Sequence, residues 1–146
     1  MKRLILLDLN GSLVLRYNGR VFKRKGLNEF IDYCQSVADV AIYTSMMKKN
    51  IRLSDYFQRH QIKQIRFVWD RIHTLQDPEP VFEWSTIKLI PENLRHEYSK
   101  ILIIDDSESK VRFIQDESKI VIPTFKDIRD DFDLIELIEK IKNKMF

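Results

Sequence analysis

Short, uninterrupted apolar runs recur along the chain, separated by stretches with helical spacing. The runs lie at residues 4–7, 40–43, 65–69, 101–104 and 119–122. Continuous apolarity is typical of strands that are covered on both faces, as in a parallel sheet. The pattern therefore predicts five strands of a mainly parallel sheet.

The stretches between the runs repeat their apolar residues every three or four positions. Their apolar positions are Leu27, Phe30, Ile31 and Cys34 in the first stretch and Leu134, Leu137, Ile138 and Ile141 in the last. Each set falls on one helical face. Strands that alternate with helices predict a three-layer, Rossmann-like α/β domain that spans residues 1–146.

Two excursions leave the predicted sheet. Residues 16–25 read as a hairpin around Asn18-Gly19, and residues 70–91 form the least regular stretch. Ligands of open parallel sheets bind beyond the carboxyl ends of the strands, so we expect both excursions to border a site. Trp69 and Trp84, beside the second excursion, either line a substrate groove or pack in the core.

Composition excludes several classes of protein. A chain of 146 residues fits one domain, and its single cysteine, Cys34, excludes an internal disulfide and favours a reducing, intracellular setting. No apolar run approaches the ~20 residues that span a bilayer, so we expect a soluble protein without a membrane partner. The net charge of +3 does not by itself indicate nucleic-acid binding. Nothing in the pattern indicates an oligomeric state.

Three of the predicted strands end in polar clusters. These clusters are Asp8-Leu9-Asn10, Thr44-Ser45 and Asp105-Asp106. Parallel strands bring such ends together, where the carboxylates repel one another unless a cation lies between them. An all-oxygen site suits Mg²⁺, and a hydroxyl and a lysine would let the pocket hold a phosphoryl group. The alternative is that these residues merely cap the helices that follow.

The clusters resemble the motifs of the haloacid dehalogenase (HAD) superfamily, in the same order along the chain. Asp8-Leu9-Asn10-Gly11-Ser12-Leu13 is similar to its first motif, D-x-D-G-T-L. Thr44 resembles the second motif, Lys88 the third, and Asp105-Asp106 the fourth. The resemblance covers essentially the whole chain and implies an HAD-like fold. Only a short helix, a strand and the irregular segment separate Thr44 from Lys88, so we expect no large cap domain.

The resemblance also implies roles for these residues. Asp8 would be the nucleophile that becomes an aspartyl-phosphate, with Thr44 and Lys88 holding the phosphate. The implied Mg²⁺ ligands are Asp8, the main-chain carbonyl of Asn10, Asp105 and Asp106. The substrate-binding residues that we expect are Gly11, Ser12, Thr44, Ser45, Lys88 and Arg24. Ser12 has a loop-stabilising alternative, and Arg24 belongs to a basic run at 23–25 that is equally typical of a solvated loop.

Within the superfamily, the chain most resembles the FCP/SCP group, also called NLI-interacting-factor-like, which acts on the C-terminal domain of RNA polymerase II. Residues 21–30 resemble its basic-x-Pro-x-x-x-E-F segment, residues 41–45 its strand ending in T-A, and residues 103–107 its D-[DN]-S. Lys25 replaces the usual proline. The resemblance implies a phosphoserine or phosphothreonine protein as substrate, with a nucleic-acid 3′-phosphate as the alternative.

Asn10 departs from the pattern, since the superfamily has an aspartate there that protonates the leaving group and activates water. An amide does neither, and loss of a general acid/base typically costs about 10²–10⁴-fold in rate. Three explanations stay open: an engineered Asp→Asn substitution, a natural binding protein that has lost turnover, and an enzyme whose acid/base lies elsewhere. We therefore expect a phosphatase of weak or no activity, with a non-catalytic phospho-ligand or protein-binding module as the alternative.

Overall fold

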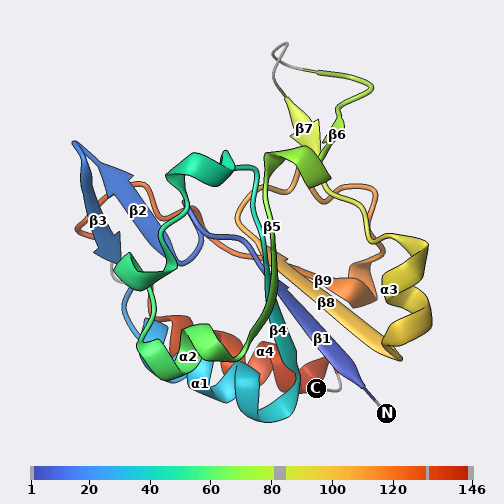
Figure 1. The fold of residues 1–146 in the computed structure, drawn as a ribbon, viewed down its shortest axis with the longest axis horizontal. Coiled ribbons are helices and arrows are strands. Elements are labelled where there is room, and N and C mark those ends of the chain that lie inside the picture. The colour runs from blue at the N-terminus through green and yellow to red at the C-terminus, as the bar shows by residue number, and fades with distance from the viewer. Residues whose placement is uncertain (1, 81–84, 131, 145–146) are drawn as a thin grey trace.

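A five-stranded parallel sheet forms the centre of the computed structural model, which describes residues 2–80, 85–130 and 132–144 (Figure 1). Its strand order is β5-β4-β1-β8-β9, with every neighbouring pair parallel. The strands are β1 (Arg3–Leu7), β4 (Asp39–Tyr43), β5 (Ile65–Trp69), β8 (Lys100–Asp105) and β9 (Lys119–Val121). All five predicted strands are confirmed.

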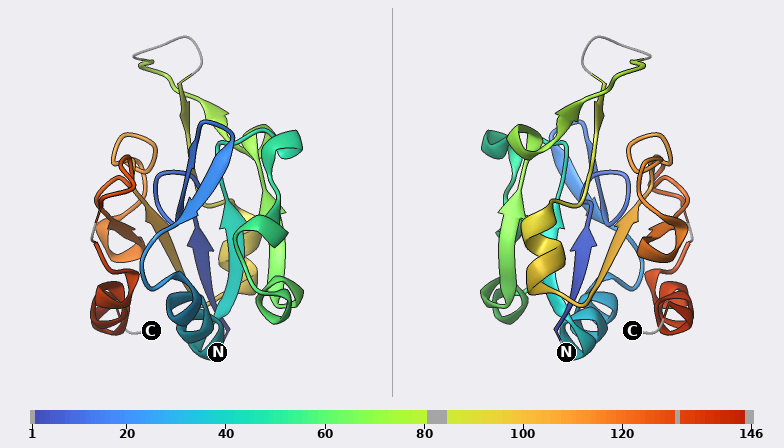
Figure 2. Two further views of the ribbon diagram at one scale, coloured as in Figure 1. Left: turned by 90° about the vertical axis from the view of Figure 1, so that its left-hand side faces the viewer. Right: turned by 90° about the vertical axis from the view of Figure 1, so that its right-hand side faces the viewer.

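Helices cover both faces of the sheet and make the three predicted layers. One face packs on α1 (Leu27–Val37), α2 (Arg59–Lys63) and α4 (Leu137–Asn143), and α3 (Glu92–Glu97) covers the other (Figure 2). Successive residues of a strand point to opposite faces. Ile5 and Leu7 therefore enter one core and Leu4 and Leu6 the other. Burial on both faces is why the strand sequence is continuously apolar.

The final helix is shorter than its periodicity predicts. It begins as a 3₁₀ turn, η5 (Leu134–Glu136), and becomes α-helical only at Leu137. Asp133 caps this turn, because its carboxylate accepts the backbone N–H of Ile135 at 3.0 Å. The predicted apolar face is confirmed, with Leu134, Leu137 and Ile141 fully buried.

Both predicted excursions lie at the carboxyl end of the parallel strands (Figure 2). The first is the hairpin of β2 (Val14–Tyr17) and β3 (Arg20–Lys23). Its turn residues Asn18 and Gly19 have φ values of 51° and 73°, as a tight hairpin turn with two left-handed residues requires. The second contains a 3₁₀ turn, η3 (Arg71–His73), and a small antiparallel pair, β6 (Leu75–Gln76) with β7 (Thr86–Ile87).

The chain between β4 and β7 contains no large cap domain among its described residues. It contains only short elements, namely η1 (Lys48–Asn50), η2 (Leu53–Asp55), α2, β5, η3 and β6. Trp69 is partly buried and packs against the core, since its ring contacts Tyr43 edge-on at 5.2 Å and stacks on His73 at 5.3 Å. Trp84 lies outside the described residues. No helix in the described part of the chain is long and apolar enough to cross a membrane.

Candidate active site

A tight loop follows β1 and positions the first polar cluster. The backbone N–H of Asp8 donates to the carbonyl of Ile104 at 3.1 Å, which extends the ladder between β1 and β8 by one residue. The carbonyl of Leu9 then accepts the backbone N–H groups of residues 12–14 at 3.1, 2.9 and 3.2 Å. This bonding fixes the Asp8 side chain at the carboxyl end of the central strand, where it is 5% exposed.

Gly11 lets this loop approach the end of β8 closely. Its φ is 88°, a conformation that residues with a side chain rarely adopt. A Cβ atom at this position would also lie 2.8 Å from Oδ2 of Asp106. The loop is held on its other side by the Gly11 carbonyl, which accepts the N–H of Phe125 at 2.6 Å. Glycine is therefore required here by geometry, whatever its part in substrate binding.

Ser12 lies between two carboxylates. Its hydroxyl oxygen is 2.8 Å from Oδ2 of Asp8 and 3.1 Å from Oδ1 of Asp106, and it accepts the backbone N–H of Asp106 at 3.1 Å. One hydroxyl proton can serve only one of the two carboxylates at a time. The loop-stabilising alternative is thus supported, because Ser12 ties the loop after β1 to the end of β8.

Lys88 is buried with no exposed surface, one residue after β7. Its ammonium group donates to Oδ1 of Asp8 at 3.1 Å, to the carbonyl of Tyr43 at 2.8 Å and to Oδ2 of Asp105 at 2.5 Å. Its backbone N–H donates to the carbonyl of Lys110 at 2.8 Å, which anchors the segment. The structure therefore brings the predicted lysine together with the predicted nucleophile and one acid of the predicted pair.

Negative charge exceeds positive charge in this cluster. One carboxylate oxygen each from Asp8, Asp105 and Asp106 lies within 4.8 Å of the others. Burial and the Asp8 charge raise the pKa of Asp105 to about 7, although Lys88 opposes this shift. Burial and Asp8 also raise the pKa of Asp106. Burial lowers the pKa of Lys88, but the attraction of Asp8 and Asp105 outweighs it and holds the pKa above its ordinary value.

The chemistry of this donor set fits a divalent cation. Three carboxylates with one lysine leave repulsion that a cation would relieve, and oxygen ligands are those that Mg²⁺ prefers. Both oxygens of Asp105 already accept hydrogen bonds, Oδ2 from Lys88 and Oδ1 from the backbone N–H of Ser107 at 2.9 Å. Both oxygens of Asp8 also accept hydrogen bonds, from Lys88 and Ser12, whereas Asp106 is half-buried and the least enclosed of the three. Which of these carboxylates bind the cation directly stays a prediction.

Thr44 reaches the same end of the sheet from β4. It is 1% exposed, and its backbone N–H donates to the carbonyl of Trp69 at 2.9 Å. Its hydroxyl accepts the N–H of Met46 at 3.1 Å, so the hydroxyl proton can serve another acceptor. The preceding carbonyl, that of Tyr43, binds Lys88. Ser45 is half-buried, and its carbonyl accepts Nε of Arg71 at 2.9 Å. The roles of Thr44 and Ser45 in phosphate binding stay predictions.

Asn10 is exposed, and its side chain supports the hairpin. Its Oδ1 accepts the backbone N–H of Arg16 at 3.0 Å, and its backbone forms an isolated bridge with Val14. The amide therefore stabilises the exit from the loop into β2. The predicted metal contact through its main-chain carbonyl stays a prediction.

The assignment of Arg24 to substrate binding stays a prediction, and the burial of its side chain does not support it. Its side chain has no exposed surface and lies beneath the loop, not in a solvated basic patch. One guanidinium nitrogen donates to the carbonyl of Ser12 at 3.0 Å and another to Asp130 at 3.2 Å. The Phe125 and Phe132 rings lie 5.3 and 4.7 Å from the guanidinium carbon. Arg24 therefore supports the loop from below.

Two cations near the site were not predicted as site residues. Lys110 is half-buried on the loop after β8, where burial and Lys88 lower its pKa while Asp105 and Asp8 act in the opposite direction. Arg71, in η3, lies close enough to contribute to the same balance. Their position in the sequence could have indicated them, because both lie on loops that follow the carboxyl ends of predicted parallel strands.

Comparison with protein-family models gives a match over most of the chain. A family model described as NLI interacting factor-like phosphatase matches residues 3–145. No curated protein matches the chain. The matched region contains every side chain of the carboxylate cluster.

Proposed function

The chain belongs to the NLI interacting factor-like phosphatase family, and we propose that it is a magnesium-dependent phosphomonoester phosphatase whose nucleophile is Asp8. One observation supports this most strongly. The Asp8 carboxylate is held between the Lys88 ammonium and the Ser12 hydroxyl, beside two further carboxylates at the carboxyl end of the sheet. This is the arrangement that phosphoryl transfer to a carboxylate needs.

In the first step, a carboxylate oxygen of Asp8 attacks phosphorus and the bond to the ester oxygen breaks. Contacts to both of its oxygens orient the carboxylate, which reduces the entropy lost on reaching the reactive geometry. The Thr44 hydroxyl holds a phosphoryl oxygen, and Lys88, whose three N–H groups all donate to protein atoms in this structure, would release one of them to do the same. The buried positive charge of Lys88 stabilises the phosphoryl oxygens in the transition state. Water then hydrolyses the aspartyl-phosphate, which restores Asp8 and releases inorganic phosphate.

Asp8 and Asp106 would hold Mg²⁺ with the main-chain carbonyl of Asn10, and Asp105 would position Lys88. When bound, the cation neutralises the charge of the phosphoryl group and lets it approach the carboxylates. Ser12 keeps Asp8 and Asp106 together through its contacts to both.

We propose that Asn10 limits the turnover of this form. The leaving oxygen must gain a proton, and the attacking water must lose one. An amide supplies neither service at neutral pH, so both steps depend on solvent or on a weaker donor. Good leaving groups need the least help, and they should react measurably. The same residue favours the second candidate function, a binding module that holds a phosphorylated ligand without turnover.

The favoured substrate is a phosphoserine or phosphothreonine in a protein. In the described part of the chain no large cap domain covers the site, which suits an extended substrate. Lys110, close to Asp105 and Asp8, and Arg71, close to Lys110, add positive charge that would attract a phosphorylated segment. A nucleic-acid 3′-phosphate is the alternative, and steeply salt-dependent binding of single-stranded DNA in a gel-shift assay would favour it.

The deciding experiment compares hydrolysis of p-nitrophenyl phosphate by this chain and by Asn10→Asp, each with and without Mg²⁺. Restoring the acid should raise magnesium-dependent turnover by about 10²–10⁴-fold. Asp8→Asn in the Asn10→Asp background is the control and should abolish that gain. If Asn10→Asp stays inert while Mg²⁺ and phosphate still raise the melting temperature, the chain is a binding module and the enzymatic proposal is wrong.

A further inference from the structure

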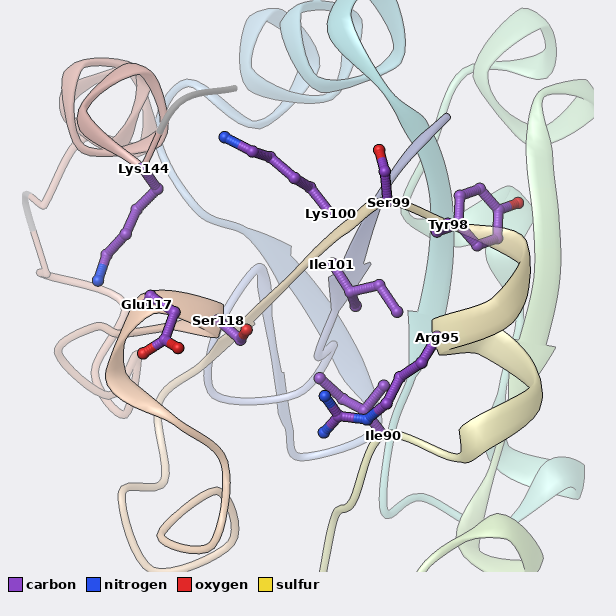
Figure 3. Close-up of a pocket in the computed structure, with 9 residues that line it drawn as sticks. All are labelled: Ile90, Arg95, Tyr98, Ser99, Lys100, Ile101, Glu117, Ser118 and Lys144. Atoms are coloured by element: carbon purple, nitrogen blue, oxygen red, sulfur yellow. The ribbon is translucent and has the colours of Figure 1, made fainter. Parts of the chain in front are cut away.

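A cavity of about 400 Å³ lies at the amino end of the sheet, away from the carboxylate cluster. It is bounded by α3, the start of β8, η4 (Asp116–Ser118) and the residue after α4 (Figure 3). Lys100, the first residue of β8, lines it, whereas Asp105, the last residue of β8, belongs to the active site. At ~3.3 Å per strand residue the two sites are about 17 Å apart along β8. The cavity is therefore a separate site.

The inner wall of the cavity is apolar. It contains Ile90, Tyr98 and Ile101, which are 7%, 3% and 8% exposed. The Tyr98 hydroxyl donates to Asp39 at 2.7 Å, so this residue offers its ring to the cavity wall and not its polar end. Pockets of ~300–1,000 Å³ with apolar walls and a few polar groups are typical of small-molecule sites.

Among the described residues that line the cavity, cations outnumber carboxylates. Arg95, Lys100 and Lys144 line the cavity with one carboxylate, Glu117. Lys144 donates to the neutral carbonyl of Asp116 at 2.6 Å, a contact that leaves its charge unbalanced. Arg95 is exposed, and its guanidinium makes no hydrogen bond or ion pair with any other described residue. Figure 3 shows it extending from α3 over Ile90 toward the middle of the cavity.

We propose that this cavity is an accessory site for a small organic anion, a molecule with a carboxylate or phosphoryl group on an apolar body. The anionic group would bind the guanidinium of Arg95, whose planar donors match such groups. Lys144 supplies further positive charge, and the apolar body lies on Ile90 and Ile101. The inference is independent of the proposed activity, since no residue of the carboxylate cluster takes part.

The test is an NMR titration of the ¹⁵N-labelled chain with phenylphosphonate and benzoate as probes. Inorganic phosphate and benzyl alcohol serve as probes that lack the apolar body and the charge, respectively. The amide signals of Arg95, Ile101 and Ser118 should shift on addition of either organic anion. The anion that binds more tightly identifies the preferred anionic group. A phenylphosphonate shift at Gly11 or Asp106 reports the active site instead, and the residue positions separate the two.

Arg95→Gln should weaken the binding of the organic anions, measured at these amides, by at least about tenfold, as loss of a charge-assisted hydrogen bond predicts. Arg59→Gln is the matched control, because Arg59 is an exposed arginine of α2, a helix on the opposite face of the sheet from α3, and does not line the cavity. The proposal is wrong if these amides do not shift, or if both variants lower the affinity for the probes equally. It is also wrong if inorganic phosphate or benzyl alcohol binds as tightly as the organic anions.

Discussion

Two cations, Lys88 and Arg24, are buried without exposed side-chain surface, and their surroundings differ. Lys88 donates to two buried carboxylates, Asp8 and Asp105, in a cluster with more negative than positive charge. Arg24 pairs with one carboxylate, Asp130, whose side chain is 18% exposed, and lies against two phenylalanine rings. Burial of a cation therefore does not identify a functional site. The surplus of carboxylates around Lys88 is what distinguishes the site that we propose to be functional.

The two cations also differ in their proposed roles, because Lys88 belongs to the reacting groups and Arg24 supports the loop. Lys88 contacts the proposed nucleophile directly, whereas Arg24 reaches the same loop only through the carbonyl of Ser12. Removing either cation should destabilise the fold. Only the loss of Lys88 should change how the protein responds to magnesium and pH.

Lys88→Met is the change with the largest expected effect. It leaves two buried carboxylates without their cation, and breaking such a contact typically costs ~3–5 kcal/mol of unfolding free energy. Denaturant unfolding measures this loss, and saturating Mg²⁺ should recover part of it. Lys110→Met is the control, because Lys110 is half-buried and makes no ion pair with any described residue. A loss no greater than that of Lys110→Met would show that the charge surplus does not matter.

Arg24→Met should cost less, about 1–3 kcal/mol, because water can reach the partly exposed Asp130 once the arginine is gone. The same unfolding experiment gives the value. Phosphate and Mg²⁺ binding by the folded fraction should change little, as calorimetry would show. If Arg24→Met abolishes phosphate binding while the chain stays folded, the supporting role is wrong and Arg24 belongs to the substrate-binding residues.

Gly11→Ala and Gly19→Ala form a matched pair. Both positions have positive φ, so both alanines should cost ~1–2 kcal/mol through backbone strain. Only the Cβ at position 11 meets Asp106, at 2.8 Å, and nothing lies within 4 Å of a Cβ at position 19. Gly11→Ala should therefore be the less stable variant and should alone weaken Mg²⁺ binding. Equal Mg²⁺ affinities in titration calorimetry would contradict the assignment of Asp106 as a ligand.

The pH dependence of stability is the smallest expected effect, when it is expressed per pH unit. The folded chain raises the pKa of Asp105 to about 7, above the ~3.9 of an unfolded aspartate, so the metal-free folded state binds the extra proton between these values. Its stability should therefore fall as pH rises from about 4 to 7, by at most about 1.4 kcal/mol per pH unit. Asp105→Asn should flatten this slope, and Mg²⁺ should oppose it, in melting curves across that range. An unchanged slope in Asp105→Asn would refute the assignment.

Much of the fold follows from local patterns. The apolar runs gave all five strands, because residues buried on both faces of a sheet leave no polar position in the run. Asn18-Gly19 gave the hairpin turn, since this pair tolerates two left-handed residues. The periodicity of the last helix does not distinguish its first turn, which is a 3₁₀ turn capped by Asp133, from the α-helix that begins at Leu137.

The sequence by itself determined which residues end the strands, and the order of motifs that brings Asp8, Thr44, Lys88 and Asp105-Asp106 to one end of the sheet. Only the tertiary structure decided which of these side chains, and which of their neighbours, form hydrogen bonds and ion pairs with one another. It assigned Ser12 to both Asp8 and Asp106, Asp105 to Lys88, and Arg24 to the underside of the loop. The physical reason is that strand ends are set by local burial patterns, whereas charge pairing depends on distances between segments up to 106 residues apart.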